Sequence, residues 1–84
     1  MACYIVICEV EPSTEFVATV KSYGTWAKLT PLIYAVKTES PAKSVRDALA
    51  EFVGDDRLIV IKSGTEAAWR NVPENVSEWM KKHL

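Results

Sequence analysis

The sequence predicts a single α+β domain spanning residues 1–84, in which an antiparallel sheet carries two helices on one face and an extra C-terminal helix follows. Three observations predict this fold class. Strand-like and helix-like segments follow one another in the order β-α-β-β-α-β. Both of these helix-like segments carry an apolar stripe and are followed by a glycine. A length of 84 residues suits one hydrophobic core and leaves no room for a second.

The first strand and the first helix differ in their hydrophobic period. Residues 4–10 are mainly β-branched and apolar, which predicts a strand that ends before Pro12. Ser13 is a suitable N-cap for the helix that follows, and Gly24 is a suitable residue just beyond its last turn. The apolar stripe of this helix consists of Phe16, Val17, Val20 and Tyr23.

A hairpin is predicted between the two helices. Residues 25–30 and 32–38 are both β-prone, and Pro31 separates them. We therefore expect two antiparallel strands that turn near Thr30 and Pro31. The hairpin distinguishes the order β-α-β-β-α-β from a plain β-α-β-α-β order, and it places both main helices on one face of the sheet. This is the layout of a ferredoxin-like domain.

The second half of the chain predicts a helix, a strand and a terminal helix. Ser40 and Pro41 form a typical helix start, an N-cap followed by proline at the first helical position, and Gly54 ends the helix. Residues 58–62 predict the last strand, and residues 63–65 a turn. The helix stripe comprises Ala42, Val45, Ala48, Leu49, Phe52 and Val53, and a terminal helix opened by Pro73 carries Val76, Trp79, Met80 and Leu84.

The predicted strands are apolar on both faces, whereas a sheet covered on one face alternates apolar with polar residues. Two helices cover only one face, so the terminal helix or a second chain must cover the other. A bare face of several hundred Å² would cost many kcal/mol at roughly 25 cal/mol per Å². We expect a homodimer packed sheet against sheet, with a self-covering monomer as the alternative. One face carries Ile5, Ile7, Ile33, Ala35, Ile59 and Ile61; the other carries Tyr4, Val6, Cys8, Leu32, Tyr34, Val36, Leu58 and Val60.

The composition is that of a globular protein, with 49% hydrophobic and 25% charged residues. A net charge of -1 argues mildly against a dedicated nucleic-acid binder. The sequence contains no apolar run long enough for a membrane helix and no signal peptide at its start. Cys3 and Cys8 point to opposite faces of one strand, roughly 16 Å apart, and cannot pair with each other. Free thiols suit a reducing compartment, so we expect a soluble cytoplasmic protein.

Several short motifs together give the chain a family resemblance. They are Tyr4-Ile5-Val6-Ile7-Cys8-Glu9, Tyr23-Gly24-Thr25-Trp26, Val36-Lys37-Thr38, Asp55-Asp56-Arg57-Leu58-Ile59-Val60, Ala67-Ala68-Trp69-Arg70 and Ser77-Glu78-Trp79-Met80-Lys81-Lys82-His83-Leu84. Over nearly the whole chain they resemble the small SinR-like proteins of bacteria and their phages, with the Ala-Trp-Arg tail the most specific part. That group is similar in fold to the small CRISPR-associated endoribonuclease-like family, which acts in spacer acquisition. The resemblance implies a ferredoxin-like homodimer.

Glu9 is the candidate for catalysis and for metal binding. In the CRISPR-associated family an aspartate ends the first strand, and the dimer axis brings two copies together around a divalent metal. Here that position is Glu9, one methylene longer, with Glu11 close by. A metal such as Mg²⁺ held by carboxylates can activate water for attack on a phosphodiester, so Mg²⁺ is the cofactor implied if the protein is a nuclease. The alternative is that Glu9 only marks where the strand leaves the core for solvent.

Four cations are the candidates for nucleic-acid binding. They could contact phosphates, while Tyr23 or Trp26 could stack on bases. The alternative is that they are ordinary solvated side chains whose field is diluted by nearby carboxylates. The four are Lys21, Lys28, Lys43 and Arg46.

Trp69 and Arg70 are the candidates for binding a protein partner, because Trp and Arg are favoured at interaction hot spots. The alternative is that the pair packs against the sheet edge in a structural role. Trp79 is expected in the core, and His83 in the last helical turn, where a cation favours the helix dipole.

The motifs of common enzyme classes are missing from the sequence. One histidine cannot build a Ser-His-Asp or Cys-His set, and neither a phosphate-binding glycine loop nor zinc-ligand spacing occurs. Two functional hypotheses follow. The first is a small dimeric accessory module of bacterial or phage origin that binds a protein or nucleic acid without cutting it. The second is a metal-dependent nuclease of the CRISPR-associated type that uses Glu9.

Overall fold

The structure of the protein is a computed structural model that describes residues 1–64 and 66–84. Thr65, which belongs to the turn predicted at residues 63–65, lies outside the described residues. The elements are β1 (Ala2–Cys8), α1 (Thr14–Ser22), β2 (Thr25–Thr30), β3 (Ile33–Thr38), α2 (Ala42–Ala50), β4 (Leu58–Lys62) and α3 (Glu74–His83).

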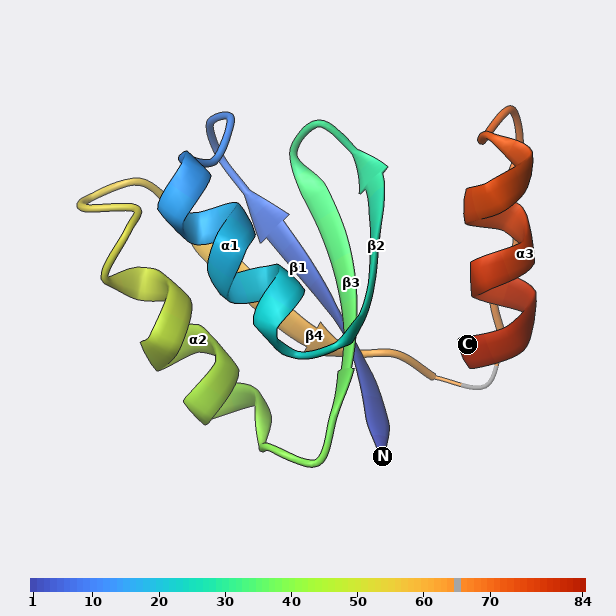
Figure 1. The fold of residues 1–84 in the computed structure, drawn as a ribbon, viewed down its shortest axis with the longest axis horizontal. Helices are drawn as coiled ribbons and strands as arrows, with labels where there is room; N and C mark the ends of the chain where they lie inside the picture. Colours follow the sequence, from blue (N-terminus) through green and yellow to red (C-terminus); the bar gives the residue numbers. More distant parts are fainter. Residues whose placement is uncertain (65) are drawn as a thin grey trace.

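The strands form one four-stranded antiparallel sheet in the order β2-β3-β1-β4 (Figure 1). The predicted hairpin is confirmed, because β2 and β3 pair with each other around residues 31 and 32. β1 lies between β3 and β4, so that Val6 pairs with Tyr34 on one side and with Val60 on the other. The edges of the sheet are therefore β2 and β4.

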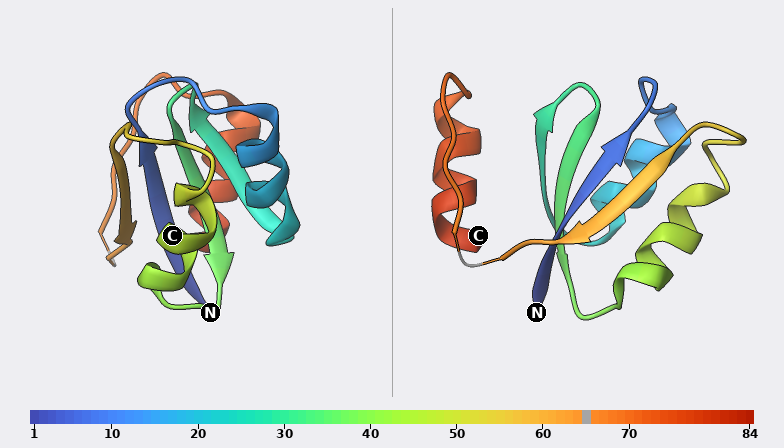
Figure 2. Two further views of the ribbon diagram at one scale, coloured as in Figure 1. Left: turned by 90° about the vertical axis from the view of Figure 1, so that its left-hand side faces the viewer. Right: turned by 180° about the vertical axis from the view of Figure 1, so that it is seen from behind.

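One face of the sheet is covered by α1 and α2, which lie side by side on it (Figures 1 and 2). Both helices are amphipathic and direct their apolar stripes at the sheet, as the helical spacing of these residues predicts. This layer forms the hydrophobic core of the domain. Its buried residues are Tyr4, Val6, Cys8, Phe16, Val20, Tyr34, Val36, Val45 and Leu49.

The first helix begins as predicted. The side chain of Ser13 accepts a hydrogen bond from the Phe16 backbone N–H at 3.2 Å, which makes it the N-cap. Gly24, just after the helix, has a φ of 87°, a left-handed conformation that glycine adopts without strain.

The second helix differs from the prediction at both ends. Ser40 is not the N-cap, because the extended backbone of Pro41 (φ -71°, ψ 160°) delays the first helical residue to Ala42. The backbone N–H of Ser40 donates to Thr38 Oγ1 at 3.1 Å in a local turn. Pro41 takes the capping position instead, and its carbonyl accepts from the N–H groups of Ser44 and Val45. The helix ends at Ala50, and a series of turns carries the chain on past residue 54.

The first strand is shifted relative to the predicted residues 4–10. It begins at Ala2, which pairs with Thr38 at the far end of β3, and it ends at Cys8. The shift follows from the length of β3, because six residues of β1 are needed to pair with the whole of that strand.

The terminal helix α3 lies on the opposite side of the sheet from α1 and α2, beside the edge strand β2 (Figure 2). Val76 and Met80 are its buried residues. No helix in the described part of the chain has the length and hydropathy needed to cross a bilayer.

Candidate functional site

The second face of the sheet is only partly covered. Ile59 and Ile61 of β4 remain 47% and 50% exposed. They pair with Ile7 and Ile5 of the neighbouring strand, and Ile7 also pairs with Ile33. We call these five residues the isoleucine patch: Ile5, Ile7, Ile33, Ile59 and Ile61.

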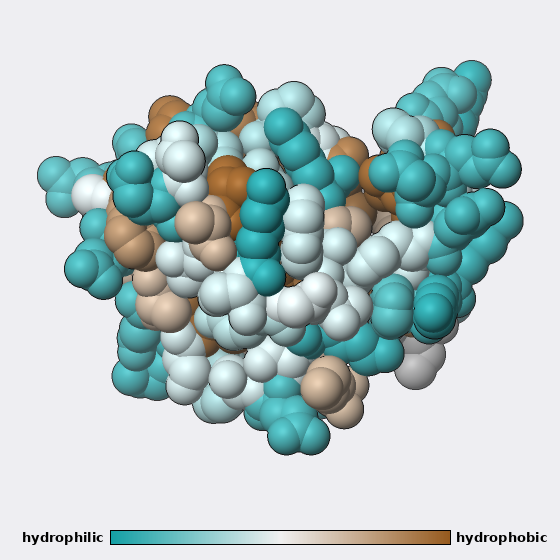
Figure 3. Space-filling view, in the orientation of Figure 1, coloured by the Kyte–Doolittle hydropathy of each residue, from teal (hydrophilic) through white to brown (hydrophobic). Residues whose placement is uncertain are grey.

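An apolar groove of about 440 Å³ overlaps the isoleucine patch, between the sheet, residues 66–72 and α3. The sheet contributes Ile5, Ile33 and Ile61 of the patch, and the terminal part of the chain contributes Trp69, Val72, Met80 and Leu84. Figure 3, in the orientation of Figure 1, shows hydrophobic residues in brown at the side of α3 that faces the sheet, with hydrophilic residues in teal around them. The terminal helix therefore covers part of the second face and leaves the β4 side open.

Trp69 is part of the wall of this groove. Its indole Nε1 donates a hydrogen bond to Ser77 Oγ at 2.9 Å, which joins residues 66–72 to the first turns of α3. The ring is half-buried, whereas the neighbouring Arg70 is exposed. This arrangement agrees with a packing role for Trp69, and a partner-binding role for the pair stays a prediction.

Glu9 follows the last residue of β1, and its side chain is held by Arg57. Its Oε1 accepts a hydrogen bond from the Arg57 backbone N–H at 3.0 Å, and Oε2 lies 3.6 Å from the Arg57 guanidinium. The Glu9 N–H in turn donates to the Arg57 carbonyl. Backbone and side chain of Glu9 therefore both bind Arg57 and join the end of β1 to the residue before β4. This geometry agrees with a structural role for Glu9 at the end of the sheet.

The described residues do not fit a metal site within one copy of the chain. Among residues 1–64 and 66–84, no group of three or more His, Cys, Asp or Glu side chains is arranged to hold a metal ion. Glu9 would supply one carboxylate whose two oxygens already face Arg57. Any Mg²⁺ bound at this position would therefore take its remaining ligands from water, a second copy or a substrate.

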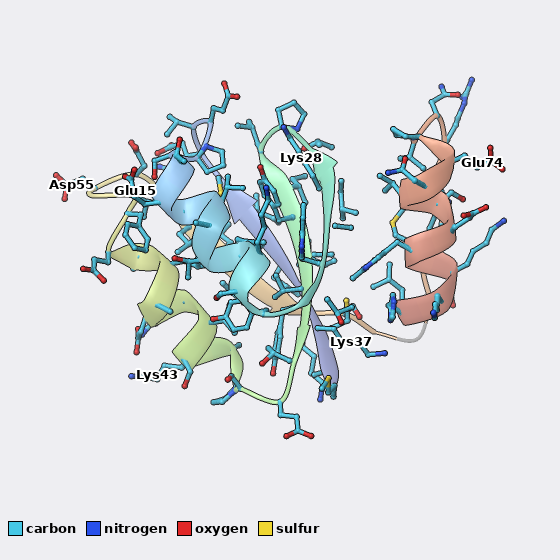
Figure 4. All side chains as sticks on the ribbon, viewed as in Figure 1. Glu15, Lys28, Lys37, Lys43, Asp55 and Glu74 are labelled. Atoms are coloured by element: carbon cyan, nitrogen blue, oxygen red, sulfur yellow. The ribbon has the colours of Figure 1, made fainter. Side chains whose placement is uncertain are left out.

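The four predicted nucleic-acid-binding cations fall into two separate groups. Lys43 and Arg46, both on α2, contact the same carboxylate of Asp47 at 3.1 and 2.7 Å. Hydrogen bonds from Arg46 and Lys43 lower the pKa of Asp47, so its negative charge is retained and offsets theirs. Figure 4 shows Lys28 beside the β2–β3 hairpin and Lys43 at the far side of the molecule on α2.

The other two cations lie near a tryptophan. Lys21, in the last turn of α1, places its ammonium 5.3 Å from the centroid of the Trp26 ring. Lys28 follows two residues later on the same strand as Trp26, and both lysines are exposed. These residues form one local group on the β2 side of the molecule.

His83 has contacts that the sequence did not predict. Its ring packs against Trp79 in a tilted arrangement with centroids 4.7 Å apart, and its Nδ1 lies 3.4 Å from Lys37 Nζ on β3. Burial, followed by the charges of Lys37 and Lys82, lowers the pKa of His83. The i,i+4 spacing of Trp79 and His83 was visible in the sequence, but the approach of β3 was not.

Acidification is therefore expected to weaken the attachment of α3. The folded chain favours the neutral ring of His83, so the penalty is absent above the unfolded pKa of about 6.5 and grows as pH falls below it. An NMR titration of the imidazole C–H signals should give a pKa below 6.5, and Lys37→Gln should raise it. A measured pKa at or above 6.5 would contradict this arrangement.

Cys3 and Cys8 are both free and buried, as their positions on one strand predicted. Burial raises the pKa of each thiol, which keeps both sulfurs protonated and unreactive. They therefore serve packing on the two faces of β1.

Searches of the chain against protein-family models and against curated proteins found no match.

Proposed function

We propose that the chain is a cytoplasmic, dimeric interaction module of ferredoxin-like fold, related to the SinR-like proteins of bacteria and phages, that associates with nucleic acid or with another protein. The proposal is supported by the strand order β2-β3-β1-β4 with two helices on one face, which is the order such a domain has. The isoleucine patch is the observation that carries the dimer, because it places five isoleucines on one sheet face and leaves two of them, Ile59 and Ile61 on the edge strand β4, about half exposed.

A second copy is the simplest cover for the isoleucine patch. In a two-fold contact the same patch of both copies meets itself, so a patch with charges of one sign would repel its copy. The patch has uncharged side chains throughout, and it extends to the edge strand β4, where Ile59 and Ile61 are the most exposed of its residues. A domain of 84 residues also gains proportionally more from such burial than a larger one.

The test is the mass of the protein in solution, measured by light scattering or sedimentation over a range of concentrations. We expect twice the chain mass of 9.4 kDa for the wild type, and the monomer mass for an Ile59→Lys/Ile61→Lys variant. Val10→Lys is the matched control, because Val10 is also 47% exposed but lies outside the patch. A monomeric wild type, or a double variant that still dimerises, would refute the proposed dimer.

The nuclease hypothesis remains an alternative, and the position of Glu9 directly after β1 is the feature that favours it. Its test is cleavage of single- and double-stranded RNA and DNA with Mg²⁺, Mn²⁺ or EDTA, beside Glu9→Ala. The hypothesis predicts metal-dependent cutting that the substitution abolishes. Circular dichroism must accompany the assay, since Glu9 also supports the start of β4. If none of the four substrates is cut, the nuclease hypothesis is wrong.

A further inference from the structure

The charges of the chain are distributed unevenly. Residues 9–15 and 43–57 contain seven carboxylates and three cations, whereas the remaining residues contain seven cations and four carboxylates. The first set lies together around the start of α1, α2 and the loop before β4, and the contact between Glu9 and Arg57 joins its two parts. The net charge of -1 therefore conceals a first set of net charge -4 and a remainder of net charge +3, which we call the acidic and the basic side. β2 and β3 of the basic side carry one lysine each, whereas α3 carries two lysines and two glutamates.

A hollow of about 240 Å³ lies on the basic side, between β2 and α3. Two half-buried tryptophans line it, Trp26 from the strand and Trp79 from the helix. The remaining lining residues are Ala27, Lys28, Asn75 and Val76. The hollow is smaller than a pocket for a drug-sized ligand, which suits one planar ring of a longer molecule whose other parts stay in solvent.

The cations around the hollow are positioned for phosphates. Lys28 is part of its lining and is exposed. Lys21 is outside the lining, but its ammonium reaches the Trp26 ring from α1. Glu74 and Glu78 on α3 reduce the positive potential, so the contact must depend on stacking as well as on charge. Aromatic rings beside exposed cations are the combination by which proteins hold single-stranded nucleic acid.

We propose that this hollow binds single-stranded nucleic acid, with one base stacked against Trp26 or Trp79 and the adjacent phosphates at Lys21 and Lys28. The proposal rests on the proposed function in taking nucleic acid as a partner, and it is independent of the dimer. Single strands are specified because the faces of bases in a duplex are covered by their neighbours. Asn75 adds an amide that can donate to or accept from a base edge.

The test is fluorescence anisotropy with labelled oligo-dT and oligo-rU of about ten nucleotides, a length within the range that stacking domains cover. We expect Trp26→Ala to weaken binding roughly 5-fold to 150-fold, as the loss of one stacked base does. Lys28→Gln should weaken binding and lower the slope of log K against log salt by about 0.7. Lys43→Gln is the matched control, because Lys43 already contacts Asp47 on the other side of the molecule.

Each outcome of the experiment decides the proposal. Failure of the wild type to bind either oligonucleotide overturns it. The proposal is also overturned if a duplex binds as tightly as the single strands and Trp26→Ala leaves that binding unchanged, because this result indicates phosphate contact without stacking. A loss in Lys43→Gln as large as that in Lys28→Gln places binding on α2 and also overturns it. If Trp26→Ala loses its circular dichroism spectrum, Lys28→Glu decides instead, because this exposed residue lies outside the core. The solution mass of the same samples reports separately on the dimer.

Discussion

Leu49→Ala is expected to lower the free energy of unfolding by about 2–5 kcal/mol, the largest effect of any variant considered. Leu49 is 0% exposed and lies in the last full turn of α2, in the core with Val45 and the helix-facing side of the sheet. Removing its three outer carbons loses their burial and leaves a cavity that close-packed neighbours fill only in part. A domain of this size has a total stability of roughly 4–13 kcal/mol, so the variant should lose a substantial fraction of its stability.

The measurement is urea unfolding followed by circular dichroism. Leu32→Ala is the matched control, because it removes the same atoms from a residue that is 36% exposed in the β2–β3 turn. We expect a loss of less than about 1 kcal/mol for that control. Equal losses for the two variants would mean that Leu49 does not occupy the core position described.

Met80→Asp is expected to detach α3 from the sheet while leaving the four strands, α1 and α2 folded. Met80 is 5% exposed and lies in the apolar groove with Ile5, Ile33 and Trp69. Burying an unpaired carboxylate there costs several kcal/mol. This cost exceeds the free energy that a short helix gains by packing against the sheet. A ten-residue helix is marginal in water, so α3 should also lose its helical structure once it is free.

Hydrogen exchange measured by mass spectrometry tests this expectation. Residues 66–84 should lose their protection in Met80→Asp, while peptides from β1 and β3 keep theirs. Asn75→Asp introduces the same charge at an exposed position of the same helix and should leave the exchange pattern unchanged. Loss of protection throughout the chain would show instead that α3 and the sheet fold as one unit.

The order of the elements could be predicted because local signals mark each of them. The Thr30-Pro31 turn between two β-prone segments predicted the hairpin, and Ser13 predicted the start of α1. The apolar character of both faces of β1 and β4 also predicted that a second face needed cover. Periodicity is enough for these inferences, because it depends only on which way successive side chains point.

The details that the sequence did not predict depend on contacts between distant residues. Ser40 has the side chain of an N-cap, but Thr38 binds its backbone N–H and Pro41 takes the position. The approach of Lys37 to His83 depends on where α3 packs against the sheet, and the spacing of residues along the sequence does not predict that position.

The candidate site could be predicted only as a set of residue types. The sequence grouped four cations on one surface, whereas the fold separates Lys43 and Arg46 from Lys21 and Lys28. The pairing of Trp26 with Trp79 across a hollow joins residues more than fifty positions apart. Such a pairing follows from the strand order and the attachment of α3, and neither is a local property of the sequence.

The central position of β1 has a consequence for how the domain is made. The first strand to leave the ribosome is the one that pairs on both sides, and its last partner, β4, ends at Lys62. At about 5–20 residues per second, the ribosome needs roughly 3–10 s to proceed from the end of β1 to the end of β4. Both edges of this apolar strand are free until β3 has been made, and one edge stays free until β4 follows, which is the situation in which nascent chains recruit chaperones. Nascent-chain folding of this protein should therefore reach completion only after β4 has left the ribosome.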